Sequence, residues 1–226
     1  MSEWRELQLG QLCSLIVDSE HKTAPKNPSG TYPLIRTTDL GMARVNLRSA
    51  QRVDAATHQH WTKRAAPKEG DLILAREAPV GGICRVPEGV DPVLGQRTVL
   101  LRPDPTTVES EFLMYRLAAP DLQARMNEMS GGATVPHLNM ADIRVFTVAG
   151  IPSFATQRRI AAVLSAFDEL IEINERRIAL LEDLARSLYQ EWFVHFRPGP
   201  RRGGVRGLRA GADPGRVERT AAGRRA

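Results

Sequence analysis

The stretch from Gln157 to Trp192, QRRIAAVLSAFDELIEINERRIALLEDLARSLYQEW, decides how this chain is organised. Its apolar residues recur at alternating intervals of four and three positions, and the pattern continues for about five heptads. A strict heptad repeat of this length predicts the seam of a left-handed coiled coil. The seam residues are Ile160, Leu164, Phe167, Ile171, Asn174, Ile178, Leu181, Ala185, Leu188 and Trp192.

The predicted helix is long for its surroundings, because at about 1.5 Å per residue it extends roughly 50–60 Å. Asn174 is the polar residue of the seam, and a buried Asn fixes register when it meets a polar partner. Two interpretations are open. The helix either packs on its own domain or pairs with a second helix of the same kind. The heptad favours pairing, and the partner would then be a second molecule.

Charge is distributed unevenly along the 226 residues, whose net charge is +5. The tail from Pro198 onward holds eight arginines against two acids and so carries +6. Residues 1–197 have 23 basic and 24 acidic groups, which leaves −1. The high isoelectric point therefore belongs to the tail, and any nucleic-acid surface of the folded part must be a local patch.

The N-terminus and the cysteines indicate the compartment. MSEWREL does not resemble a signal peptide, and no apolar run approaches the roughly 20 residues that span a bilayer. Cys13 and Cys84 are isolated and have no zinc-ligand spacing, which fits a reducing cytosol. We expect a cytoplasmic protein that does not enter a membrane.

The order of strand-like and helix-like patterns along the sequence predicts an α+β fold. Short β-like runs bounded by Gly or Pro cover 32–38, 71–78, 81–87 and 97–103, and a helical spacing over 109–129 is divided by Pro120. These patterns predict a small α/β domain over 1–150 and one long coiled-coil-forming helix over 151–196. An Arg/Gly-rich tail over 197–226 is expected to be disordered, since it is poor in apolar side chains.

Motifs for catalysis and for metal binding are missing from the sequence. It contains no GxxxxGKS or GxxxxGKT phosphate loop, no GxGxxG opening a helix, and no GxSxG elbow. His58 and His60 form an HxH pair without nearby carboxylates, which favours surface histidines. Asp71 and Glu77 resemble a nuclease pair only loosely, because Ala78 and Pro79 follow in place of a basic residue. We predict a binding module with no catalytic residue, no metal and no cofactor of its own.

Polar residues at predicted strand ends and turns have the chemistry that reads DNA. Arg and Lys suit guanine edges and phosphates, Asn and Gln suit adenine, and Ser and Thr are adaptable. Each of these residues alone is more often an ordinary polar residue of a protein surface. The candidates are His21, Lys22, Arg36, Thr37, Thr38, Arg76, Glu77, Gln96, Arg97, Thr134, His137 and Asn139.

The block IPSFATQRRIAAVLSAFDELIEINERRIALLEDLARSLYQEWFVHFR resembles the helical conserved region of the specificity subunit of Type I restriction-modification enzymes. Upstream, YPLIRTTDLG, GDLILAREAPVGGICRVPEG, VLGQRTVLLRP and GGATVPHLNMADIRVF resemble a target recognition domain of that family. The resemblance covers residues 1 to about 197. A typical member has two recognition domains, each followed by a long helix, so this chain resembles a half-subunit. The tail composition suggests a frameshift in a longer ancestor as a hypothesis.

The resemblance implies a subunit that binds DNA and partner subunits and catalyses no reaction itself. Such a subunit reads a bipartite double-stranded DNA site and docks methyltransferase subunits, which use S-adenosylmethionine to methylate adenine, and restriction subunits, which cleave. Two half-subunits would replace one full-length subunit by forming a homodimer through their helices. This dimer would read an inverted repeat. Two rivals remain. The chain could be a truncated or regulatory subunit that only binds partner subunits, or a free-standing nuclease.

Overall fold

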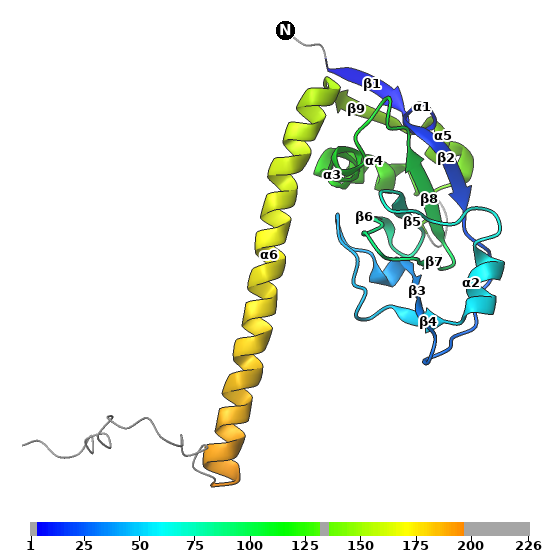
Figure 1. The fold of residues 1–226 in the computed structure, drawn as a ribbon. Coiled ribbons are helices and arrows are strands. Elements are labelled where there is room, and N and C mark those ends of the chain that lie inside the picture. The colour runs from blue at the N-terminus through cyan, green and yellow to red at the C-terminus, as the bar shows by residue number, and fades with distance from the viewer. Residues whose placement is uncertain (1–3, 132–135, 197–226) are drawn as a thin grey trace, which may run out of the picture. The chain divides into compact units, whose positions relative to one another are not determined.

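The computed structural model describes residues 4–131 and 136–196 (Figure 1). Contacts within the chain divide it after Glu169 into two units. The first unit, up to residue 169, holds the sheets and the shorter helices. The second unit, from residue 170 onward, holds the rest of the long helix. Each unit is described by itself.

The elements of the first unit alternate between short strands and short helices. The strands are β1 (Arg5–Gln8), β2 (Cys13–Asp18), β3 (Tyr32–Ile35), β4 (Gln51–Val53), β5 (Leu72–Arg76), β6 (Val80–Arg85), β7 (Val93–Leu94), β8 (Thr98–Pro103) and β9 (Thr147–Ile151). The helices are α1 (Leu9–Leu12), α2 (Ala55–Trp61), α3 (Ser110–Ala118), α4 (Pro120–Met129), α5 (Met140–Val145) and the first part of α6 (Phe154–Tyr189), with a 3₁₀ turn at Thr37–Asp39. The expected mixed α/β domain followed by a long helix is confirmed.

The central sheet has the order β2-β8-β5-β6 and is antiparallel throughout. A second sheet has the order β4-β3-β7, in which β3 pairs antiparallel with β4 and parallel with β7. β1 and β9 form a separate antiparallel pair, so the N-terminal strand closes against the strand that precedes α6.

The central sheet is covered on both faces, which explains the unbroken apolar run LILA in β5. Leu72 and Leu74 are buried in a cluster with residues of α3 and α4, whereas Ile73 and Ala75 are buried in a second cluster with residues that include Ile35. Successive side chains of a strand point to opposite faces, so a strand with two covered faces is apolar at every position.

Pro120 separates α3 from α4, as predicted. It occupies the first turn of α4, where the missing backbone donor costs no helical hydrogen bond. α3 begins where Glu109 accepts a hydrogen bond from the Phe112 amide at 2.6 Å. The two helices pack against β6 and close the larger core cluster.

The long helix begins inside the first unit. Ser153 Oγ accepts a hydrogen bond from the Thr156 amide at 3.4 Å, as expected for a helix cap. Gln157 is fully buried; its amide donates to the Pro152 carbonyl at 3.0 Å and accepts from the Glu109 amide at 2.9 Å. Ile160, the first seam residue, packs against the core cluster. By its internal contacts the compact unit extends to residue 169.

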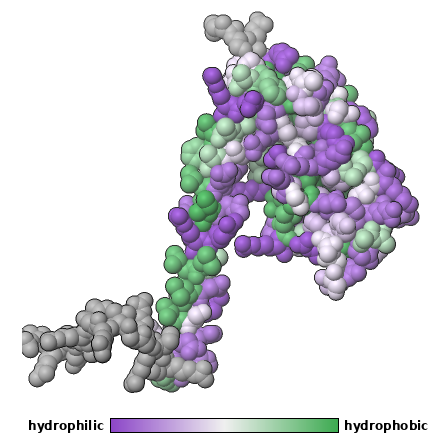
Figure 2. Space-filling model, in the orientation of Figure 1, coloured by the Kyte–Doolittle hydropathy of each residue, from purple (hydrophilic) through white to green (hydrophobic). Residues whose placement is uncertain are grey.

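In the second unit every residue from Leu170 to Phe196 is exposed within the described chain. The seam residues after Ile160 are exposed as well, and Figure 2 shows hydrophobic surface along the helix. Within the first unit the helix contacts its own domain as far as Asp168, which accepts hydrogen bonds from Tyr115 and Arg44. The helix ends in a π-helical segment, Gln190–Val194. The tail predicted from 197 lies outside the described residues.

Candidate nucleic-acid interface

The ends of the central strands meet at one edge of the sheet. Asp18 at the end of β2 pairs with Val99 of β8, and Arg76 at the end of β5 pairs with Val80 of β6. Because the strands are antiparallel, the chain leaves β2 and β5 at the same edge where it enters β8 and β6. This edge carries the strand-end cluster, which consists of Asp18, His21, Arg76, Glu77, Gln96, Arg97 and His137.

Arg76 lies at the centre of the strand-end cluster. Its Nη1 donates to the Leu138 carbonyl at 3.2 Å, and its Nε lies 3.3 Å from Asp18 Oδ1. These last two atoms are buried and neither makes a well-aligned hydrogen bond in the described chain, so the contact is an ion pair. Asp18 Oδ2 also lies 3.1 Å from His21 Nε2, and this connects an exposed histidine to the buried pair.

Glu77 joins the next loops of the strand-end cluster. Its side chain lies 3.1 Å from Arg97 Nε, and its backbone forms an isolated bridge with His137. Gln96 donates to the His21 carbonyl at 3.3 Å. The backbone of Arg97 has a φ of 73°, a left-handed conformation that residues with a side chain adopt at a cost.

Arg36 and Thr37 lie beside this edge. The Gly95 amide donates to the Ile35 carbonyl at 2.7 Å, which places Arg36 against the loop that carries Gln96 and Arg97. The buried hydroxyl of Thr37 donates to the Ala78 carbonyl at 3.1 Å, so it supports the loop after β5. Eight of the twelve candidates thus lie at or beside one edge of the central sheet.

Of the other four candidates, Lys22 directly follows His21 and Thr38 directly follows Thr37. Thr38 and Lys22 are exposed, and the Lys22 ammonium has no ion-pair partner among the described residues. The Asn139 side chain donates to Asp142 at 3.1 Å at the start of α5. Thr134 lies outside the described residues.

Most cations at this edge have a carboxylate partner. Arg76 pairs with Asp18, Arg97 with Glu77, and Arg36 with Asp39. The paired charges therefore nearly cancel, and the carboxylates hold the arginine side chains in place. Such a surface suits position-dependent contacts to base edges better than non-specific attraction to phosphates.

Asp71 and Glu77 do not form a nuclease pair. They flank β5 at its two ends, about 20 Å apart at roughly 3.3 Å per residue. Asp71 is buried and accepts from Arg102 Nε at 2.8 Å and Nη2 at 2.7 Å. Across residues 4–131 and 136–196, no group of three or more His, Cys, Asp or Glu side chains is arranged to hold a metal ion.

The two histidines of the HxH pair have different surroundings. His58 stacks on Tyr32 with ring centroids 4.0 Å apart, and its Nε2 lies 2.8 Å from Asp91. His60 is exposed and faces Lys63 at 3.4 Å. The expectation of two surface histidines is right for His60, whereas His58 is partly buried and packs in the fold. No described helix has the length and apolarity required to cross a membrane.

A family model described as the Type I restriction modification DNA specificity domain matches residues 1–183. The chain belongs to this family of specificity proteins. The match covers both the strand-end cluster and most of α6, so the resemblance seen in the sequence is confirmed.

Curated relatives of this specificity-family chain are longer. It is 31% identical over 135 residues to the Type I restriction enzyme MjaIX specificity subunit of Methanocaldococcus jannaschii, a match covering 60% of this chain and 30% of the relative. It is 24% identical over 202 residues to the HindI specificity subunit of Haemophilus influenzae, covering 88% of this chain and 42% of that subunit. The chain spans about half the length of these relatives, and the matched parts cover less than half of either one.

Solved structures of specificity subunits share its fold. The S subunit from M. genitalium matches with a TM-score of 0.65 and 18% identity over 86% of this chain and 46% of that one. The HsdS subunit from Thermoanaerobacter tengcongensis matches with a TM-score of 0.54 and 22% identity over 94% of this chain and 52% of that one.

The sequence did not reveal the carboxylates of this specificity domain. Asp18 and Asp39 hold two candidate arginines, yet neither stood out, because a single acid after a strand is common. The one available signal was spacing: Asp39 follows Arg36 by three residues and closes a short turn with it.

Proposed function

We propose that this chain is a DNA-sequence-recognition subunit of a Type I restriction-modification enzyme, which homodimerises through α6 and reads a bipartite inverted repeat. The first unit would read one half-site through the strand-end cluster and its neighbours. The proposed dimer rests on the seam of α6. The seam residues after Ile160 are exposed, and they are complementary to the same residues of a second copy.

The seam is self-complementary when two copies run antiparallel about a midpoint at Arg176. Ile160 then lies opposite Trp192, Leu164 opposite Leu188, Phe167 opposite Ala185, Ile171 opposite Leu181, and Asn174 opposite Ile178. From Leu164 to Leu188 every seam residue has a seam partner, the large Phe167 meets the small Ala185, and Asn174 meets the apolar Ile178; Ile160 instead packs on the core of its own unit. Volume complementarity of this kind favours one register over others.

A second apolar row supports docking of a further helix. Val163, Leu170, Ile173, Leu180 and Leu184 are exposed beside the seam. At 100° per residue, the row and the seam together span an arc of roughly 200°, wider than a seam between two helices covers. We assign this row, with the exposed residues near Arg158, to the methyltransferase subunit.

In this proposal the chain carries out no reaction. The methyltransferase subunit would bind S-adenosylmethionine and methylate adenine, and a restriction subunit would cleave, both in the cytoplasm. A two-fold dimer presents the same reading surface twice, so its site would be an inverted repeat with a non-specific spacer.

The solution mass of the purified chain tests the dimer. We expect a dimer that becomes a monomer when Ile171→Asp and Ile178→Asp are introduced together, because two charges would then be buried in the seam. The control is Ala179→Asp, an exposed position outside both apolar rows. A wild-type monomer at micromolar concentration would exclude the homodimer and, with it, the inverted repeat.

The two alternative functions predict different experimental results. A subunit that only binds its partners would co-purify with the methyltransferase without directing methylation to any sequence. A free-standing nuclease would cleave DNA by itself with a divalent metal, and the separation of Asp71 from Glu77 argues against that activity.

A further inference from the structure

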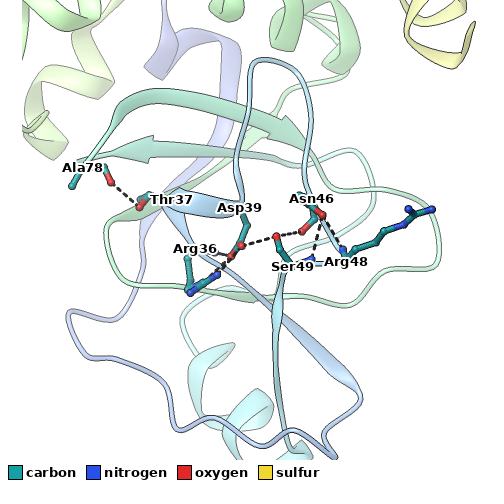
Figure 3. Close-up of polar contacts among 7 residues, drawn as sticks. All are labelled: Arg36, Thr37, Asp39, Asn46, Arg48, Ser49 and Ala78. Carbon is teal, nitrogen blue, oxygen red and sulfur yellow. Dashed lines mark hydrogen bonds and ion pairs between the residues drawn. The ribbon is translucent and has the colours of Figure 1, made fainter. Parts of the chain in front are cut away.

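Asp39 is a buried carboxylate, 2% exposed, that holds one arginine with both of its oxygens (Figure 3). Its Oδ2 accepts from the Arg36 amide at 3.0 Å and from Arg36 Nε at 2.9 Å. Its Oδ1 accepts from Arg36 Nη2 at 2.8 Å and from the Ser49 hydroxyl at 3.2 Å. Burial alone would raise the pKa of Asp39, but the hydrogen bonds from Arg36 lower it below its ordinary value, so the carboxylate stays charged.

The Arg36 guanidinium has five N–H groups, and three of them donate hydrogen bonds within the fold. Asp39 takes the edge formed by Nε and Nη2. With the Gln51 amide turned so that its oxygen faces the cations, that oxygen accepts from Arg36 Nη1 at 3.0 Å and from Lys26 at 3.0 Å. The N–H groups left over are one on Nη1 and one on Nη2. They form a fork that can donate two parallel hydrogen bonds when Gln51 takes the Nη1 hydrogen on the Cδ side.

The backbone beside Arg36 is closely packed. A Cβ atom at Gly95 would lie 2.7 Å from the Ile35 carbonyl oxygen and 3.1 Å from Arg36 Cγ. The stem of Arg36 is thus confined between Gly95 and Asp39, while 35% of its side chain remains exposed. The free fork is held in one orientation before any ligand arrives.

We propose that Arg36 reads a guanine through this fork, with Asp39 as the residue that positions it. The O6 and N7 acceptors of a guanine in the major groove accept two parallel hydrogen bonds from such a fork. The proposal rests on the proposed function, since it places one base contact within the recognised half-site. Preorganisation by Asp39 lowers the cost of ordering a long side chain on binding.

A second buried pair in the same unit is a matched comparison. Asp71 holds Arg102 through the same Nε and Nη2 edge and is 3% exposed. Arg102 Nη2 also donates to the Ala66 carbonyl at 3.0 Å, so its outer edge is partly occupied. The pair lies at the opposite end of β5 from the strand-end cluster. Disrupting it should affect stability without altering base recognition.

The test selects binding sites from a pool of random-sequence duplexes with the full-length chain and its variants. Arg36→Lys keeps the charge but removes the fork, Asp39→Asn loosens the fork, and Asp71→Asn is the control. We expect the wild type to select a motif that contains a guanine. Arg36→Lys and Asp39→Asn should each lose about 5- to 150-fold discrimination at that same base pair, with the other positions unchanged. Asp71→Asn should select the wild-type motif.

The outcomes separate the two proposals. If the wild type selects no motif, the proposed function fails. If it selects a motif that Arg36→Lys and Asp39→Asn leave unchanged, or weaken equally at every position, the guanine contact is overturned while the proposed function stands. Arg36→Lys decides the matter if Asp39→Asn does not fold, because the lysine leaves the Asp39 charge compensated.

Discussion

The Tyr115 hydroxyl of α3 donates a hydrogen bond of 2.7 Å to Asp168 Oδ2 of α6. The other oxygen of Asp168 accepts from Arg44 Nη2 at 3.1 Å. Burial, and then Asp168 itself, raises the pKa of Tyr115, so the phenol remains a donor at any physiological pH. One carboxylate therefore connects α6, near the end of the first unit, to α3 and to the loop before β4.

Removing the Tyr115 hydroxyl should weaken this connection. We expect Tyr115→Phe to lower the free energy of unfolding by about 1–2 kcal/mol, since a hydrogen bond to a charged acceptor is lost. Tyr189→Phe is the control, because Tyr189 is exposed and makes no hydrogen bond through its hydroxyl in the described chain. Denaturant unfolding of both variants measures the difference; equal stabilities would show that the Tyr115 hydroxyl contributes nothing.

Cysteine cross-linking should reveal the register of the seam. A mixture of Asn174→Cys chains and Ile178→Cys chains should form disulfides on mild oxidation, because an antiparallel pair centred on Arg176 places these positions opposite each other. Neither variant alone should cross-link. The native Cys13 and Cys84 do not interfere, since burial raises the pKa of each thiol to about 12. Cross-linking of either single variant with itself would instead indicate parallel helices.

Arg97→Gly should weaken DNA binding with little net change in stability. Glycine adopts the φ of 73° without strain, which stabilises the fold by about 1 kcal/mol, while the exposed ion pair with Glu77 contributes at most a similar amount. The variant should bind DNA more weakly, with a salt slope smaller by about 1 if Arg97 meets a phosphate. Arg97→Lys keeps the charge and should restore part of the affinity. Wild-type affinity in Arg97→Gly would show that this side chain touches no DNA.

Two left-handed glycines should respond differently to alanine. Gly81 has a φ of 94°, and a Cβ there would lie within 3 Å of the Gln123 amide oxygen. Gln123 cannot move freely, because its Nε2 donates to the Gly81 and Leu117 carbonyls. Gly81→Ala should cost about 2–4 kcal/mol, whereas Gly89→Ala, with a φ of 70° and open space, should cost about 1 kcal/mol. Equal costs would mean that the Gln123 contact is unimportant.

Glu111 should destabilise the fold at neutral pH. Burial raises the pKa of its carboxyl, Arg85 opposes that shift, and Glu109, Glu169 and Asp168 add to it. The unfolded chain therefore loses this proton at a lower pH, and stability falls as pH rises through the raised pKa. We expect Glu111→Gln to unfold at a higher temperature than the wild type at pH 7, by an equivalent of under about 1 kcal/mol. The difference should vanish near pH 4; a less stable variant at pH 7 would contradict the assignment.

Three of the four strands of the central sheet could be predicted because their apolar runs are bounded by Gly or Pro. β5 and β8 were predicted from LILA and VLL, and Pro120 correctly separated α3 from α4. The heptad also predicted the long helix α6. These features depend on local patterns that tertiary packing does not override.

The sequence did not predict which of the candidate residues lie together in space. His21, Arg76 and Arg97 are distant in sequence and meet only because the strands are antiparallel. Thr37 was suggested as a DNA contact, yet its hydroxyl is buried against Ala78. Burial at this edge depends on long-range pairing, which short-range periodicity does not encode.

The buried Gln157 bears on recombination between family members. An exchange of recognition domains that joins two genes at residue 151 would set Gln157 of one parent against Glu109 of the other. Ile160 and Ala161 of one parent would likewise pack against the core residues of the other parent. A crossover after Glu169 transfers the whole packed unit and leaves only the exposed seam to be matched. Chimeras joined there should inherit both a stable fold and a new DNA target.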